Sequence, residues 1–99
     1  MSLKKTYPIN ESFLRAAIRE LAALQNWAET SRHEGEGTII YRGELYGLRH
    51  EYRFTLTKTD PGALKTSVRI ETDGPGAKDE IEKQFLLLEK IMASEEVIN

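Results

Sequence analysis

His50 is the side chain in this sequence with the greatest capacity for chemistry, because an imidazole changes charge near neutral pH and can act as a base or a ligand contact. It lies in a segment of alternating apolar and charged residues, on the apolar side between Leu48 and Tyr52. A catalytic histidine needs an orienting partner, and no carboxylate shares that side within the segment. We therefore expect a structural histidine whose nitrogens bond to a tyrosine, a carbonyl or water.

The composition offers few ligands for a metal ion. Zinc sites use three or four Cys, His, Asp or Glu side chains, and this chain has no cysteine and only two histidines, His33 and His50. The spacings HxxxH and HExxH and an aspartate-rich loop are absent. No nucleophile is matched by a nearby acid or base with an orienting partner. We expect no metal, no cofactor and no enzymatic activity.

The segment Gly74-Pro75-Gly76-Ala77-Lys78 precedes a helical pattern and invites comparison with a phosphate-binding loop. The spacing GxxxxGK[ST] is absent. Asp79 and Glu80 follow in the first helical turn, where their charge would repel a phosphate. A plain strand-to-helix turn is the better interpretation.

The basic residues of the central strands do not indicate a nucleic-acid surface. The net charge of the chain is −2, and glutamates alternate with these basic residues. Sheets that bind RNA display aromatic side chains on their exposed face, whereas Tyr41, Tyr52 and Phe54 face the apolar side by parity. We expect no nucleic-acid binding. The basic residues concerned are Arg42, Arg49, Arg53, Lys65 and Arg69, and the glutamates are Glu44, Glu51 and Glu71.

An amphipathic helix is expected in the first part of the chain. Asn10 is a favourable N-cap, and Glu11 precedes Arg15 by one turn, the order that favours an ion pair. Trp27 lies beyond the apolar stripe of this helix, and it either covers one end of the core or is exposed as an anchor for a partner. The stripe consists of Phe13, Leu14, Ala17, Ile18, Leu21, Leu24 and Ala28.

Alternating residues predict an antiparallel sheet in the middle of the chain. Even-numbered side chains from Leu48 through Ile70 are expected to face the helices, and their odd-numbered neighbours to face water. Near the N-terminus, Pro8 permits an edge strand or none. The expected strands are 28–32, 38–43, 48–59 and 64–71, with a weaker pattern over 3–9, and the expected turns are 33–37, 43–47 and 60–62.

A second helix is expected to start near Pro75, which suits the first helical position. Its core stripe consists of Ile81, Phe85, Leu88 and Met92. Leu86 and Leu87 lie about 120° to either side of this stripe, so at least one of them should be exposed. Together with Trp27, Val97 or Ile98, these leucines would form a surface suited to self-association or to a protein partner.

The elements combine into a single α+β domain over residues 1–99. We expect a two-layer sandwich of order (β)-α-β-β-β-β-α, with a mainly antiparallel sheet and both helices on one face. In element order the chain is similar to small helix-grip or two-layer α/β sandwich domains, a group that includes lipid-binding proteins, and to secretion-chaperone-like folds that work as dimers. This resemblance rests on topology without a shared motif, so it implies no activity.

The chain has no run of about 18 apolar residues and no apolar core of a secretory signal at its N-terminus. We therefore expect a soluble cytoplasmic protein that does not bind membranes. Two hypotheses remain for its function. The first is a small non-enzymatic interaction module, which binds a protein partner or a second copy through Leu86, Leu87 and Trp27. The alternative is a small apolar-ligand-binding domain with a helix-grip-like groove near His50, in which Tyr41 and Tyr52 are polar contacts.

Overall fold

The computed structural model describes the backbone of residues 1–30, 37–45, 47–59 and 64–98, and the side chains of the same residues except 45 and 95–98. The elements are β1 (Ser2–Tyr7), α1 (Glu11–Leu24), β2 (Ala28–Glu29), β3 (Thr38–Leu45), β4 (Leu48–Lys58), β5 (Thr66–Glu71) and α2 (Ala77–Ile98). The predicted α+β class and element order are confirmed. His33, the predicted turn at 60–62 and most of the turn at 33–37 lie outside the described residues, as do the side chains of Val97 and Ile98.

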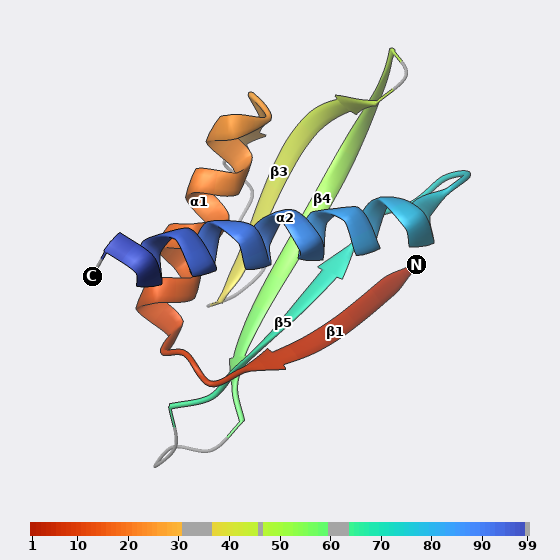
Figure 1. Ribbon diagram of the computed structural model, residues 1–99. Coiled ribbons are helices and arrows are strands. Elements are labelled where there is room, and N and C mark those ends of the chain that lie inside the picture. Colours follow the sequence, from red (N-terminus) through yellow and green to blue (C-terminus); the bar gives the residue numbers. More distant parts are fainter. Residues whose placement is uncertain (31–36, 46, 60–63, 99) are drawn as a thin grey trace.

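The five strands form one antiparallel sheet in the order β1-β5-β4-β3-β2. β1 is an edge strand that pairs with β5 over six residues, so the weak N-terminal pattern does form a strand. β2 forms the opposite edge and comprises Ala28 and Glu29; Thr30 is not part of it, and the last two residues of the strand expected over 28–32 lie outside the described residues. Figure 1 shows α2 crossing the sheet, with the N-terminal strand beside β5.

The faces of the sheet follow the predicted alternation through its centre. Tyr52, Phe54 and Val68 are almost fully buried, whereas Arg49 and Arg69 are exposed on the other face. Cross-strand pairing matches Phe54 with Ile70, which joins apolar side chains of neighbouring strands within the core. The alternation therefore separates an interior face from a charged outer face.

Strict parity from Leu48 through Ile70 fails at several positions, and one outer-face residue of β3 is also buried. Leu48 and Leu64 are 65% and 72% exposed, because Leu48 is the first residue of β4 and Leu64 precedes β5, which begins at Thr66 and not at the predicted residue 64. Ser67 is buried although it is odd-numbered, since β1 pairs alongside it and its Oγ lies 2.8 Å from Thr6 Oγ1. Ile40 is on the outer face, yet it is only 2% exposed, and it shares a hollow with its cross-strand partner Arg53.

α1 begins as predicted and ends earlier. The Asn10 Oδ1 accepts a hydrogen bond of 2.8 Å from the Phe13 N–H, and Arg15 lies 3.0 Å from Glu11. The helix ends at Leu24, which is 68% exposed, and Ala28 belongs to β2. The predicted apolar stripe is therefore one turn too long, because the backbone leaves the helix at residues 25 and 26.

α2 begins at Ala77, two residues later than a start at Pro75 requires. Gly74 and Gly76 adopt φ values of +101° and +76°, which glycine accepts without strain, and they form the turn before the helix. The predicted stripe is confirmed, since its four side chains are buried. Gln84 is fully buried as well, although its polar side chain lies outside the predicted stripe.

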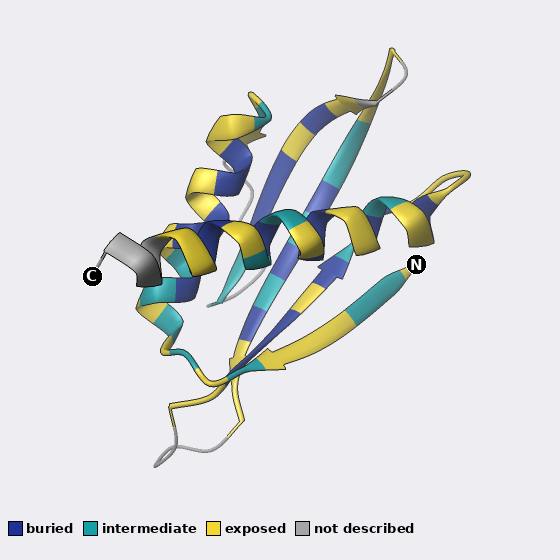
Figure 2. Cartoon of the chain, viewed as in Figure 1, coloured by how far each residue is buried: buried dark blue, intermediate teal, exposed yellow. Residues whose placement is uncertain are grey.

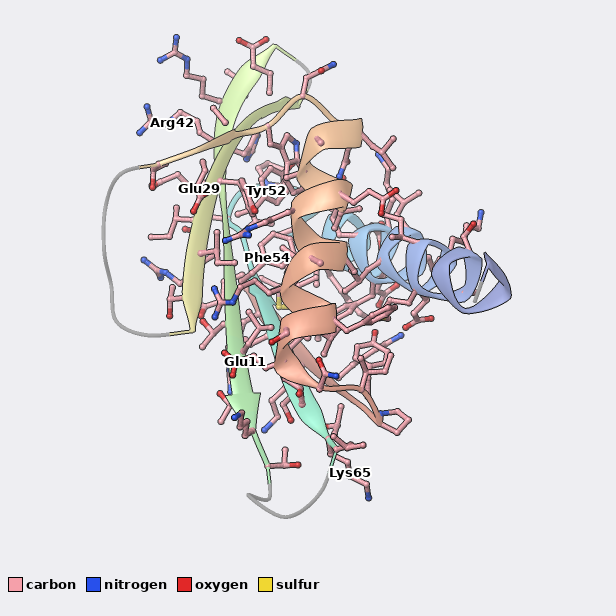
Figure 3. All side chains as sticks on the ribbon, turned by 90° about the vertical axis from the view of Figure 1, so that its left-hand side faces the viewer. Glu11, Glu29, Arg42, Tyr52, Phe54 and Lys65 are labelled. Carbon is pink, nitrogen blue, oxygen red and sulfur yellow. The ribbon has the colours of Figure 1, made fainter. Side chains whose placement is uncertain are left out.

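Both helices lie on the same side of the sheet when the molecule is turned by 90° (Figure 3). Buried side chains of α1, α2, β3, β4 and β5 form one apolar cluster between the layers. In Figure 2 the buried positions of both helices alternate with exposed ones along their length, which is the pattern of helices with one covered side. Within the part of the chain that the structure describes, neither helix has the length and apolar character needed to cross a membrane.

Candidate functional site

Four aromatic side chains gather between α1 and the β2 edge of the sheet. Trp27 lies parallel to Tyr52, with ring centroids 4.1 Å apart and an interplanar angle of 13°. Tyr41 and Phe54 each lie about 6 Å from the indole, and they meet each other edge to face. Tyr52 and Phe54 point from β4 toward α1 in Figure 3.

Gly43 forms the floor under the indole of Trp27. A Cβ at this position would overlap the indole Cδ1 and Nε1 atoms, so the ring rests directly on the backbone of β3. We call the space bounded by Tyr41, Gly43, Tyr52 and Phe54 the aromatic slot. Trp27 is partly buried in this slot, and it comes from the short segment that joins α1 to β2.

Of the three residues predicted as ligand contacts, Tyr41 and Tyr52 border the aromatic slot. His50 pairs with Gly43 across the strands, and its ring lies against the turn before α2, with Cε1 3.4 Å from the place of a Cβ on Gly74. The ring of Trp27, which was predicted as a partner contact, occupies the space beside Tyr52. Tyr41 and Tyr52 therefore border a position that a side chain of the same chain already fills, whereas the ring of His50 lies at the turn before α2.

A buried polar network links α2 to α1 and to the sheet. The Tyr52 hydroxyl donates a hydrogen bond of 3.2 Å to Glu80 Oε1, which also accepts one of 2.8 Å from the Gln84 amide. Gln84 and Gln25 exchange two amide hydrogen bonds of 2.7 and 2.9 Å between the helices. Burial, together with the nearby carboxylate of Glu80, raises the pKa of the Tyr52 hydroxyl above its ordinary value. The network positions α2 and keeps Tyr52 as a neutral donor.

The opposite side of α2 is bound to β1 through Glu89. Its Oε2 accepts a hydrogen bond of 2.7 Å from the Tyr7 hydroxyl and lies 3.1 Å from the Lys5 ammonium. The Tyr7 hydrogen bond holds the pKa of the Glu89 carboxyl below its ordinary value, and Lys5 adds to this effect. Lys5 also lies over the ring of Phe85, 5.3 Å from its centroid.

An apolar groove lies between the C-terminal end of α1 and the C-terminal half of α2. Its volume is about 430 Å³, and its floor is made by Leu21 and Ile91. Leu24 and Leu87 stand on opposite walls, with Glu20 and Lys90 among the charged residues around them. We call this the helical groove; its lining consists of Glu20, Leu21, Leu24, Gln25, Leu87, Lys90, Ile91 and Ser94.

The predicted partner contacts are divided between these regions. Leu87 is half-buried in the helical groove, and Leu86 is 59% exposed on the adjoining surface of α2. Trp27 contributes to the aromatic slot instead. Leu24 was assigned to the core from its spacing, so the sequence interpretation missed its place on the groove wall, and no signal in the spacing distinguishes it from the buried positions.

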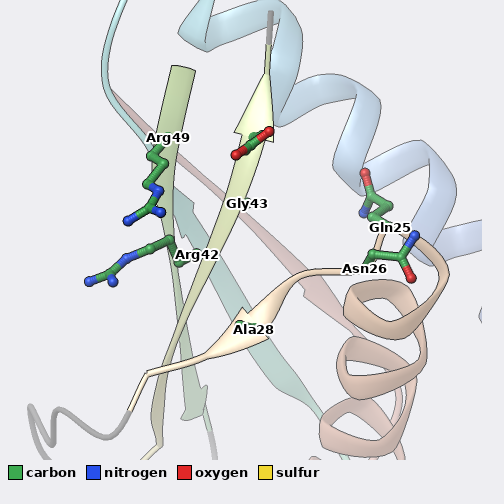
Figure 4. A pocket seen from close by; sticks show the side chains of 7 residues that line it. Gln25, Asn26, Ala28, Arg42, Gly43 and Arg49 are labelled. Carbon is green, nitrogen blue, oxygen red and sulfur yellow. The ribbon is translucent and has the colours of Figure 1, made fainter. Parts of the chain in front are cut away.

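A second cavity of about 540 Å³ lies at the β2 edge of the sheet. Figure 4 shows Gln25 and Asn26 on one side of β3 and the guanidinium groups of Arg42 and Arg49 on the other. Gly43, the floor of the aromatic slot, also lines this cavity. We call it the edge cavity, and it borders the segment that carries Trp27.

Metal-binding side chains do not cluster in threes or more within the described ranges. A comparison with models of known protein families finds no match to this chain, and a comparison with curated proteins finds no related sequence.

Proposed function

We propose that this chain is a small non-enzymatic interaction module and that it binds a second copy of itself through the helical groove. The observation that carries the proposal is the exposure of Leu24 beside a groove that is already apolar. An exposed leucine alone is ordinary, but here Leu24, Leu87 and Ile91 adjoin one another across two helices. Such a continuous apolar surface is typical of an association site.

The charges at the groove favour a second copy as the occupant. Glu20 belongs to the α1 wall and Lys90 to the α2 wall. A two-fold axis parallel to the groove places α1 of one copy over α2 of the other, because such an axis exchanges the two walls. Glu20 then faces Lys90 of the second copy, and the pair occurs twice. The surface is thus complementary to itself in charge as well as apolar.

Leu86 extends the same surface outward along α2. It lies one helical turn before Lys90, so a partner that covers Lys90 also approaches Leu86. Two charged side chains, Glu82 and Lys83, lie one helical turn before this leucine on the same surface. Leu86 therefore suits the border of an interface better than its centre.

Sedimentation velocity over concentrations up to about 1 mM tests the proposal, since this range detects weak dimers. The wild-type chain is expected to dimerise, and Leu24→Lys is expected to remain monomeric because it places a charge in the apolar centre of the interface. Leu86→Lys should weaken the dimer less. Leu48→Lys is the matched control, since Leu48 is 65% exposed in a different part of the molecule and its replacement should leave the dimer unchanged.

Charge reversal tests the two-fold arrangement. Glu20→Lys alone and Lys90→Glu alone each create two like-charge contacts, so each should weaken self-association by about tenfold or more. A mixture of the two variants restores both opposite-charge contacts and should form a heterodimer. A wild-type chain that stays monomeric throughout, or a dimer that is indifferent to Leu24→Lys, would contradict the proposal.

A further inference from the structure

The aromatic slot is complete without the segment that fills it. Its walls and floor come from β3 and β4, which pair with each other over eight residues. Trp27, in contrast, enters from the connection between α1 and β2. The sheet therefore holds the slot in shape independently of the ring that occupies it.

The connection that carries Trp27 is held by few interactions. β2 consists of Ala28 and Glu29, both exposed, which pair with Arg42 and Tyr41, and the N–H of the next residue, Thr30, donates a hydrogen bond of 2.9 Å to the Ile40 carbonyl. Asn26 adopts a φ of +59°, a left-handed conformation that is uncommon outside glycine. The Trp27 N–H donates a hydrogen bond of 2.9 Å to the Ala22 carbonyl. This segment has little regular structure to keep it closed against the sheet.

Two buried hydroxyl groups near this segment lack hydrogen bonds in the described part of the chain. Tyr41 is 3% exposed, and its hydroxyl has no partner there. The hydroxyl of Thr30, the residue directly after β2, is also buried without one. A buried polar group without a partner destabilises the state that buries it. Movement of β2 away from the sheet would expose both hydroxyl groups to water, which lowers the free energy needed for that movement.

The edge cavity gives the segment room to move. It is lined by Gln25, Asn26 and Ala28, which flank Trp27 on both sides, and by Gly43 beneath the indole. The residues on either side of Trp27 therefore border open space, which leaves room for the segment to move.

We propose that the aromatic slot is a binding site for a flat, uncharged aromatic ring, and that Trp27 is the occupant that the chain supplies for itself. A ring from a ligand would stack on Tyr52 as the indole does, because parallel offset rings attract one another and both lose water. Gly43 is essential to this site, since any Cβ there takes the space of the ring. This site is separate from the helical groove and does not depend on self-association.

Indole is the probe for an emptied slot. Trp27→Gly removes the internal ring, and indole is expected to bind this variant with a dissociation constant of about 1 mM or below and to raise its melting temperature. The matched control is Trp27→Gly combined with Gly43→Val, in which the valine side chain fills the floor of the slot. Saturable binding should disappear in this double variant. A folded Trp27→Gly chain without saturable indole binding would overturn the proposal.

The native chain provides a second test that does not depend on the stability of any variant. Trp27 is the single tryptophan, so 5-fluorotryptophan labels this position alone. We expect ¹⁹F spectra to show one resonance for the stacked ring and, as indole is added, a growing second resonance at the position of a solvent-exposed indole. If the spectrum keeps one unchanged resonance up to about 5 mM indole, the slot is closed to ligands in the native chain and the proposal fails.

Discussion

β1 and β2 lie at opposite edges of the sheet and are held to it by different means. β1 pairs with β5 over six residues, and side chains from it bond to β5 and α2. β2 pairs with β3 over two residues, and the adjoining segment contributes one large aromatic ring. The first attachment is distributed over many weak contacts, whereas the second is concentrated in Trp27.

This difference determines how each edge responds to damage. A single hydrogen bond contributes about 0.5 to 1.5 kcal/mol net, so the loss of one contact leaves most of the β1 attachment intact. Burial of an aromatic ring stabilises a fold by more than one such hydrogen bond, and a single substitution removes all of that stabilisation. The attachment of β2 should therefore depend mainly on one residue, whereas no single residue should determine the attachment of β1.

Among substitutions at the two edges, Trp27→Ala should have the largest effect on the stability of the fold. Removal of a well-packed tryptophan costs about 3 kcal/mol, since the cavity beside Tyr52 and Phe54 cannot close fully against a rigid sheet. The free energy of unfolding, measured by urea denaturation, gives the effect directly. Leu48→Ala serves as the control and should change stability by less than about 0.5 kcal/mol. A loss below about 1 kcal/mol for Trp27→Ala would show that the ring does not hold the β2 edge.

Gly43→Ala should have an intermediate effect, and its sign should depend on Trp27. In the wild-type chain the added methyl group overlaps the indole and is expected to destabilise the fold by about 1 to 3 kcal/mol. In the Trp27→Ala background the overlap is absent, and alanine is favoured over glycine in a strand by a fraction of a kcal/mol. A double-mutant cycle measured by denaturation should show this reversal. Equal costs in both backgrounds would mean that the ring and the floor are not coupled.

The β1 edge should give the smallest effects. Tyr7→Phe removes one hydrogen bond to Glu89 and should cost about 1 kcal/mol. Because Glu89 has a folded-state pKa below its ordinary value of 4.5, its contribution to stability is present above that pH and is lost as the pH falls through the folded-state pKa. Glu89→Gln should remove this part of the acid dependence, which denaturation at neutral pH and near pH 3 would measure. An unchanged pH profile would contradict the assignment of Glu89 to this contact.

The sequence predicts the centre of this fold well because the periodic signal is strongest there. Alternation across Tyr52, Phe54 and Val68 identifies the buried face of the sheet, and the three- and four-residue spacing from Leu14 to Leu21 identifies the buried side of α1. Local capping is equally readable, since Asn10 and the pair of Glu11 and Arg15 act within one helical turn. These features depend on neighbours in sequence.

The features that the sequence did not predict depend on contacts with residues of other elements. Leu24 continues the helical spacing but faces solvent, because α2 crosses α1 without covering that wall of the groove. Gln84 is polar and yet fully buried, because Gln25 of the other helix satisfies its amide. The place of Trp27 follows from the absence of a side chain at Gly43, on a strand far along the chain. Spacing alone carries no information on such partners.

The pairing of β1 with β5 sets the order in which the chain can be completed during synthesis. Ser2 leaves the ribosome about 70 residues before its partner Glu71, so β1 is synthesised well before the strand with which it pairs. Until then β1 has no strand beside it, and the earliest independent unit is the hairpin of β3 and β4, whose contacts are local. β1 thus emerges before its partner strand and docks late, so it stays within reach of chaperones after β3 and β4 have already paired.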